Sequence, residues 1–128
     1  MRLLLDTHAL IWWLAGDPLL SAEARAAVAD LENEVFVSVA SAWEIATKYR
    51  IGKLPQAPAL AMHLSGALTR QGFIELPITV QHGQTAGDLP GPHRDPLDRM
   101  LISQATPLDL ALVSSDTVFD RYGIRRLW

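Results

Sequence analysis

The chain has 128 residues, of which 49% are hydrophobic and 20% charged, and it contains no cysteine. These values exclude a disordered chain, disulfides and thiolate metal sites, and they fit one globular domain over residues 1–128. No apolar run reaches the roughly 20 residues of a membrane span, and Asp6 interrupts the apolar N-terminus before a signal peptide forms, so we expect a cytoplasmic protein without a membrane segment.

Short apolar runs alternate with helical patterns along the first half of the chain. In chain order we expect a strand at 3–5, a helix at 7–14, a second helix capped by Ser21, a strand at 35–37, and a helix from Ser38 or Ser41 to about Arg50. Asp17-Pro18 breaks the first helix, and Gly52 stops the third. One face of the second helix is predicted to carry Ala24, Ala27, Val28 and Leu31.

The same alternation continues to the C-terminus. We expect a helix at 60–70, a strand at 73–76, a weaker helix at 80–86, a loop at 88–93, a helix from Asp95-Pro96 to about Ala105, a strand at 110–113, a short helix after Asp116 and an edge strand at 124–127. Strands that alternate with helices predict an α/β fold, with a central parallel sheet of four to five strands flanked by helices.

Two aspartates follow predicted strands. Asp6 comes directly after the strand at 3–5, and Asp116 follows the strand at 110–113. Ligands of open α/β folds bind outside the carboxyl ends of the strands. Either Asp is also suited to cap a helix or close a turn, but two strands that both lead into Asp favour a shared site.

Two further acidic residues lie on predicted helices. Glu44 follows Trp43 near an apolar face, although a helical glutamate usually faces solvent. Asp95 precedes Pro96 and is the natural N-cap, whereas Asp98 shares a face with the apolar residues of its helix. We therefore favour Asp98 as the site residue and Asp95 as the cap.

Clustered carboxylates repel one another, and a hard divalent cation with oxygen ligands relieves that repulsion. No phosphate-binding glycine loop, dinucleotide motif or nucleophilic serine elbow occurs in the chain, so its chemistry rests on the carboxylates. This pattern indicates metal-assisted chemistry on a phosphate ester.

The net charge of −3 argues at first against a nucleic-acid partner. If four carboxylates bind metal, the ten other acidic residues oppose eleven Lys and Arg, and the remaining surface is near neutral. The arginines that could contact a phosphate backbone, or be ordinary solvated charges, are Arg94, Arg99, Arg121, Arg125 and Arg126. Arg99 or Thr7 is a candidate for contact with the scissile phosphate.

Four blocks of the sequence resemble the conserved blocks of PIN-domain proteins, above all the VapC-type toxins of bacterial type II toxin–antitoxin pairs. The blocks are LLDTHALIW at 4–12, SAWEIATK at 41–48 with GKL at 52–54, HRDPLDRMLI at 93–102 and LVSSD at 112–116. They span essentially the whole chain in order. The resemblance implies a Mg²⁺- or Mn²⁺-dependent endoribonuclease that hydrolyses RNA and is held silent by a cognate VapB-type antitoxin protein.

The resemblance also assigns the metal-binding and catalytic roles to Asp6, Glu44, Asp98 and Asp116. The role of Asp95, as a metal ligand or only as the helix cap, stays open, because family members use the aspartates of this helix differently. One or two metal ions would bind among these carboxylates, with Glu44 binding metal or orienting water.

Three other functions remain as alternatives: a PIN nuclease for structured DNA or RNA maturation, a receiver-like signalling domain, and a non-catalytic binding module. A receiver needs a tight acidic pair after its first strand, whereas here a single Asp6 is present.

Trp12 and Trp13 point about 100° apart on a helix, so we expect one in the core and one on a surface, the alternative being that both are partly buried. The resemblance implies an antitoxin groove or a homodimer contact there.

Overall fold

The five strands form one parallel sheet in the order β3-β2-β1-β4-β5. The computed structural model describes residues 1–54 and 61–128. Its strands are β1 (Arg2–Leu5), β2 (Glu34–Ser38), β3 (Ile74–Leu76), β4 (Ala111–Val113) and β5 (Arg126–Leu127). The predicted parallel α/β sheet is therefore confirmed, with β5 as an edge strand.

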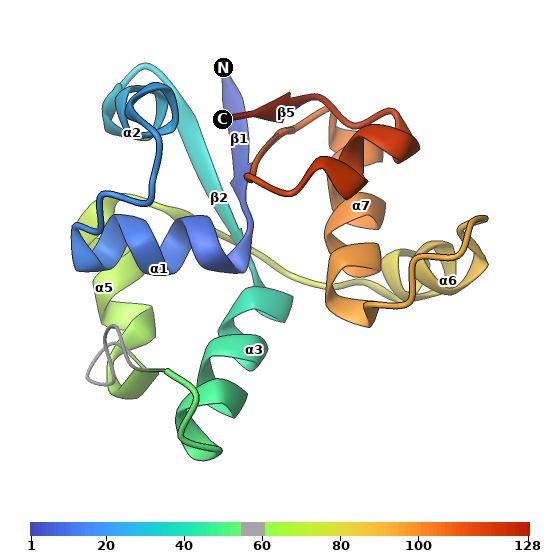
Figure 1. The fold of residues 1–128 in the computed structure, drawn as a ribbon, viewed down its shortest axis with the longest axis horizontal. Coiled ribbons are helices and arrows are strands. Elements are labelled where there is room, and N and C mark those ends of the chain that lie inside the picture. The colour runs from blue at the N-terminus through green and yellow to red at the C-terminus, as the bar shows by residue number, and fades with distance from the viewer. Residues whose placement is uncertain (55–60) are drawn as a thin grey trace.

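Helices cover both faces of this sheet (Figure 1). They are α1 (Thr7–Ala15), α2 (Ala22–Ala29), α3 (Val39–Arg50), α5 (Leu64–Gln71), α6 (Val80–Asp88), α7 (Pro96–Leu108) and the 3₁₀ helix η1 (Thr117–Tyr122). No helix in the described part of the chain is long and apolar enough to cross a membrane.

The central strand β1 divides the core into two clusters. Side chains alternate between the faces of a strand, so Leu3 and Leu5 pack on the side of α1, α2 and α5, and Leu4 packs on the side of α7 and η1. All three leucines are fully buried. The apolar run that predicted a buried strand thus supplies the centre of both clusters.

A buried glutamine joins α7 to the carboxyl ends of two strands. The Ser38 hydroxyl donates a hydrogen bond to Gln104 Oε1 at 2.6 Å, and Gln104 Nε2 donates to the carbonyls of Leu76 and Pro77 at 3.4 and 3.2 Å. Ser38 Oγ also accepts from the Ala40 N–H, so Ser38 rather than Ser41 caps α3. This network fixes α3 and α7 relative to the same edge of the sheet.

Two predictions about apolar residues are wrong. Leu31 is 98% exposed, because α2 ends at Ala29 and the chain becomes extended at Asp30. The second wrong prediction placed one of Trp12 and Trp13 in the core and the other on a surface, whereas both are partly buried. Trp12 packs against His8 and Trp128, and Trp13 donates a hydrogen bond to Gln71.

The helix expected at 60–70 starts at Leu60, which lies outside the described residues. Within them, α5 ends at Gln71, and Gly72 follows it with a positive φ of 73°. The short helix expected after Asp116 is present as η1, and Asp116 is its N-cap.

We predict that Gln104→Leu lowers the free energy of unfolding by roughly 2 kcal/mol. The Ser38 hydroxyl would lose its acceptor, and the carbonyls of Leu76, which is buried, and Pro77 would lose their donor. Urea denaturation measures the change, with Gln84→Leu on the exposed side of α6 as the matched control. Equal stability of the two variants would show that the Gln104 network does not hold the fold together.

Candidate active site

The four predicted acidic residues line a single cavity of about 400 Å³. They come from four separate segments: the β1–α1 junction, α3, the first turn of α7 and the β4–η1 turn. The other residues that line this cavity are Thr7, His8, Trp12, Asp95, Ser115 and Phe119. The fold therefore brings together side chains that lie up to 110 positions apart, from Asp6 to Asp116.

Asp6 is the most buried of these carboxylates, with 8% of the residue exposed. It lies where β1 ends, its backbone N–H donates to the Val113 carbonyl, and its Oδ1 accepts from the Ala9 N–H at 2.7 Å. Burial raises the pKa of Asp6, opposed by hydrogen bonds from Ser114 and Ala9, while the charge of Glu44 adds to the rise. Asp6 is thus both a helix cap and a carboxylate that is costly to ionise.

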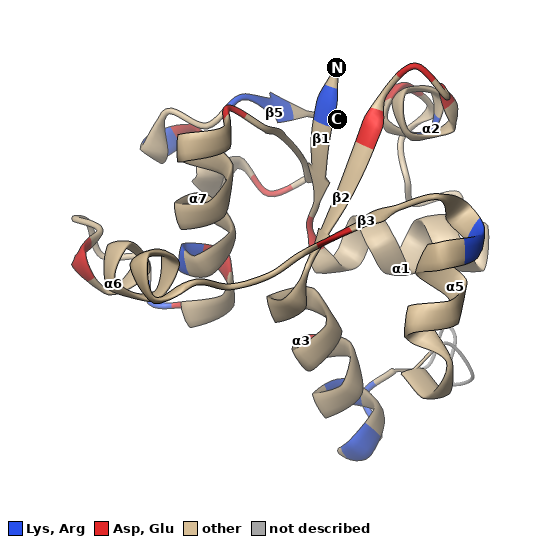
Figure 2. Ribbon diagram, turned by 180° about the vertical axis from the view of Figure 1, so that it is seen from behind, with Lys and Arg blue, Asp and Glu red and all other residues tan. Residues whose placement is uncertain are grey.

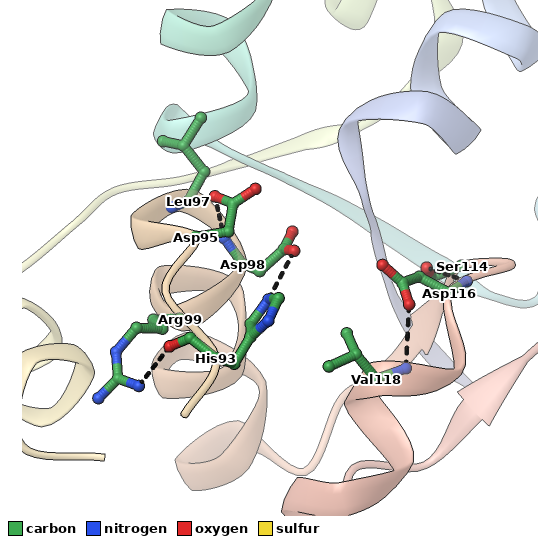
Figure 3. Close-up of polar contacts among 8 residues, drawn as sticks. All are labelled: His93, Asp95, Leu97, Asp98, Arg99, Ser114, Asp116 and Val118. Carbon is green, nitrogen blue, oxygen red and sulfur yellow. Dashed lines mark hydrogen bonds and ion pairs between the residues drawn. The ribbon is translucent and has the colours of Figure 1, made fainter. Parts of the chain in front are cut away.

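Asp95 and Asp98 have separate positions at the start of α7 (Figure 3). The Asp95 Oδ1 accepts hydrogen bonds from the backbone N–H groups of Leu97 and Asp98, at 2.9 and 3.3 Å. The Asp98 Oδ2 contacts His93 Nε2 at 2.9 Å. Asp95 is therefore the N-cap, as the sequence predicted, although it also lines the cavity.

The cavity disfavours the ionised form of Asp98. Burial raises the pKa of Asp98 to about 6, and the charges of Asp95 and Asp116 add to this, while the hydrogen bond with His93 opposes it. His93 comes from the loop before α7 and reaches across to this carboxylate. The sequence places His93 near the site without indicating this contact, because a loop side chain five residues away has no fixed direction.

Glu44 and Asp116 complete the group from opposite sides. Glu44 is half-buried on α3, and its Oε2 lies 3.4 Å from Lys48 Nζ one helical turn later. Asp116 is exposed; its Oδ1 accepts from the Val118 N–H at 3.0 Å, and its own N–H donates to Ser114 Oγ. The solvent-facing position considered for Glu44 is therefore excluded.

The donor set fits a hard divalent cation. Every acidic group at the cavity offers carboxylate oxygens, and Mg²⁺ is usually held by one or two carboxylates while it keeps several waters. Glu44, Asp98 and Asp116 each use one oxygen for a local contact, which leaves the second oxygen as a further acceptor. Within residues 1–54 and 61–128, no three such groups stand close enough to enclose an ion directly, so a cation held there would keep water ligands.

Arg99 serves the structure rather than the cavity. Its guanidinium donates to the backbone carbonyls of Ala86, Gly87, Leu89 and His93, and these bonds hold the end of α6 and the following loop against α7. It does not line the carboxylate cavity, so Arg99 is a wrong candidate for the phosphate contact. Thr7 does line it, and its hydroxyl donates to Ser41 Oγ at 3.1 Å.

The basic residues are spread over several elements (Figure 2). Arg125 lies 3.6 Å from Asp109, and Arg126 forms two hydrogen bonds with Asp120. Arg94 and Arg121 are exposed and form no ion pair within the described residues. Two of the five arginines considered for phosphate contacts therefore remain available.

Four cavity residues were missed by the sequence analysis, namely His8, Trp12, Ser115 and Phe119. His8 and Trp12 line the cavity from α1, with their ring centroids 5.6 Å apart. Their separation of four positions places them on one face of the helix that Asp6 caps. That spacing was the signal that could have identified them.

The comparisons with known proteins agree on one family. The sequence model of the PIN domain matches residues 3–125. The chain is 44% identical over 64 residues to a protein named Ribonuclease VapC16 from Mycobacterium tuberculosis; the matched segment is 50% of this chain and 44% of that relative. The chain is thus compared with less than half of that relative's length.

Solved structures share the fold at low identity. VapBC2 from Rickettsia felis, solved with a DNA fragment from its promoter, has a TM-score of 0.73 and 16% identity, covering 98% of this chain and 97% of the other. VapBC-1 from nontypeable Haemophilus influenzae has a TM-score of 0.66 and 16% identity, with coverages of 98% and 96%.

The raised pKa of Asp98 predicts how stability depends on pH without metal. Between about pH 4 and pH 6 the folded state keeps a proton that the unfolded state has lost, so stability falls as pH rises through this window, by at most about 3 kcal/mol. Asp98→Asn should remove most of this fall and be more stable than the parent at pH 7.

The measurement is urea denaturation in EDTA across pH 4–7. Asp88→Asn, an exposed carboxyl on α6, is the matched control and should follow the parent. The pKa of Asp6 is also raised, so the stability of Asp98→Asn should still fall slightly as pH rises. If Asp98→Asn loses stability as steeply as the parent, the cavity does not disfavour the charge of Asp98.

Proposed function

The chain belongs to the PIN-domain family, and we propose that it is a metal-dependent endoribonuclease that hydrolyses RNA phosphodiester bonds. The observation that carries this proposal is the convergence of Asp6, Glu44, Asp98 and Asp116 on one cavity. Carboxylates with raised pKa values are a costly arrangement unless a cation binds them. The relative named as a ribonuclease supports the choice of RNA as substrate.

In this proposal Asp6, Asp98 and Asp116 would hold Mg²⁺ or Mn²⁺, some of them directly and the others through water ligands of the ion. A divalent ion bound there would lower the pKa of a coordinated water and would offset negative charge on the phosphate oxygens. Glu44 orients the attacking water or is a further metal ligand. Its Oε2 lies against Lys48, so its other oxygen is the one that would take this role. His93 positions Asp98 through their 2.9 Å contact, and Asp95 fixes the first turn of α7.

We further propose that the protein is the toxin of a toxin–antitoxin pair, silenced in the cytoplasm by a VapB-type antitoxin protein. The support is the fold shared with VapBC complexes, together with the relative named VapC16. In this proposal residues 1–128 form one nuclease domain. The homodimer expected from the resemblance stays a prediction.

Cleavage of RNA by purified variants tests the assignment of the aspartates. Asp98→Asn should lower kcat by more than about a hundredfold with Mn²⁺ present, because a neutral amide is a poor metal ligand and even outer-shell partners are worth 10–100-fold. Asp95→Asn should keep most of the activity, because Asn caps a helix about as well as Asp. Activity in Asp98→Asn and none in Asp95→Asn would reverse the two roles.

Expression in a bacterial host tests the same residues in cells. The parent and Asp95→Asn should arrest growth, whereas Asp6→Asn and Asp98→Asn should not, although all four proteins fold and accumulate. Co-expression of the protein encoded next to this gene should restore growth if that protein is the antitoxin. Equal toxicity of all variants would contradict a carboxylate-dependent nuclease.

A further inference from the structure

A second cavity, also of about 400 Å³, lies beside the carboxylate cavity and has no role in the proposed chemistry. Its walls are the loop 90–93 and, from η1, Val118, Arg121 and Tyr122. Through this loop, His93 lines the second cavity while its Nε2 contacts Asp98 of the first. His93 therefore links the second cavity to a carboxylate of the first.

The helix η1 also runs from one cavity to the other. Asp116 caps it at the carboxylate cavity, and Arg121 and Tyr122 line the second cavity at its far end. At about 2 Å of rise per residue, Arg121 lies roughly 10 Å along the helix from Asp116. A stacked nucleic-acid strand advances about 3.4 Å per nucleotide, so the second cavity is within about three nucleotides of the carboxylates.

The loop that forms the second cavity is held in place from both sides. Gly91 has a φ of 93°, and a Cβ at this position would lie 3.1 Å from the Tyr122 hydroxyl oxygen. On its other side, Arg99 donates to the carbonyls of Leu89 and His93 at the ends of the loop. The positive φ favours glycine at 91, a Cβ there would press on Tyr122, and these contacts fix the shape of the loop.

The chemistry of these walls matches a nucleotide. Tyr122 offers an aromatic ring, and Pro90 and Pro92 add apolar surface. Arg121 is exposed at the rim and forms no ion pair within the described residues, unlike Arg126, which pairs with Asp120. Aromatic rings that stack bases, combined with cations that contact the backbone, are the usual means of binding single-stranded nucleic acid.

We propose that the second cavity binds a nucleotide of a single-stranded RNA, within about three positions of the scissile phosphate. The base stacks on Tyr122, and Arg121 contacts a phosphate of the same strand. Without a bound cation the carboxylate cavity repels phosphates, so the exposed guanidinium of Arg121 supplies attraction for the strand outside the carboxylate group. The proposal rests on the proposed nuclease function, and it assigns substrate binding to residues outside the carboxylate group.

Binding of mononucleotides tests the cavity independently of cleavage. We expect titration of the ¹⁵N-labelled chain with each of the four nucleoside 5′-monophosphates in EDTA to shift backbone amide resonances of residues 91, 93 and 118–123. Arg121→Gln and Tyr122→Leu should weaken binding about tenfold, whereas Tyr122→Phe keeps the ring and should retain it. Arg70→Gln, at an exposed arginine on α5, is the matched control. Shifts confined to other residues would overturn the proposal.

Cleavage kinetics separate this proposal from the nuclease function. Tyr122→Leu and Arg121→Gln should raise KM for a short oligoribonucleotide about tenfold and change kcat by less than about threefold. If the parent cleaves RNA and both variants have the same KM and kcat as the parent, the nucleotide site is refuted and the proposed nuclease function is not affected. If the chain cleaves no RNA but binds mononucleotides at this cavity, the proposed nuclease function is refuted. The proposal that the cavity binds nucleotides is then supported by itself.

Discussion

The repulsion among carboxylates gathered at one edge of a parallel sheet is the constraint on which the rest of this structure depends. Strands β1 and β4 are neighbours in register, so the residues that follow them, including Asp6 and Asp116, emerge at the same edge. Burial then raises the pKa of both Asp6 and Asp98. A protein gains nothing in stability from this arrangement, which is why it indicates a function.

The fold supplies a partial remedy for this repulsion. Helices α1 and α7 both begin at the cavity, with Asp6 and Asp95 as their N-caps. The N-terminus of a helix carries a partial positive charge that favours carboxylates and phosphates nearby. Parallel strands followed by helices therefore place acidic caps and compensating dipoles at one edge together. Capping and metal binding, which the sequence presented as competing roles for Asp6 and Asp116, are compatible because a carboxylate has two oxygens.

The strands and the cap of α7 were predictable from the sequence, because each depends on local pattern, and Asp6 and Asp116 were expected together because both follow strands; Glu44 was assigned to the site only by the family resemblance. The run Leu3–Leu5 indicated a buried strand, and Asp95 before Pro96 indicated a cap; the structure has both. Features that depend on distant partners were not predictable. Leu31 is exposed because α2 ends early, and the guanidinium of Arg99 is occupied by four carbonyls of a loop. No pattern in the sequence shows where such long side chains find their partners.

The central claim is that a divalent ion binds among the carboxylates, and anomalous diffraction from a crystal containing Mn²⁺ tests it most directly. The claim predicts an anomalous peak inside the carboxylate cavity, bound by Asp98 and by Asp6 or Asp116, with water completing the coordination. The peak should be absent from crystals of Asp98→Asn. A peak elsewhere on the protein, or none at a Mn²⁺ concentration that supports RNA cleavage, would contradict the account.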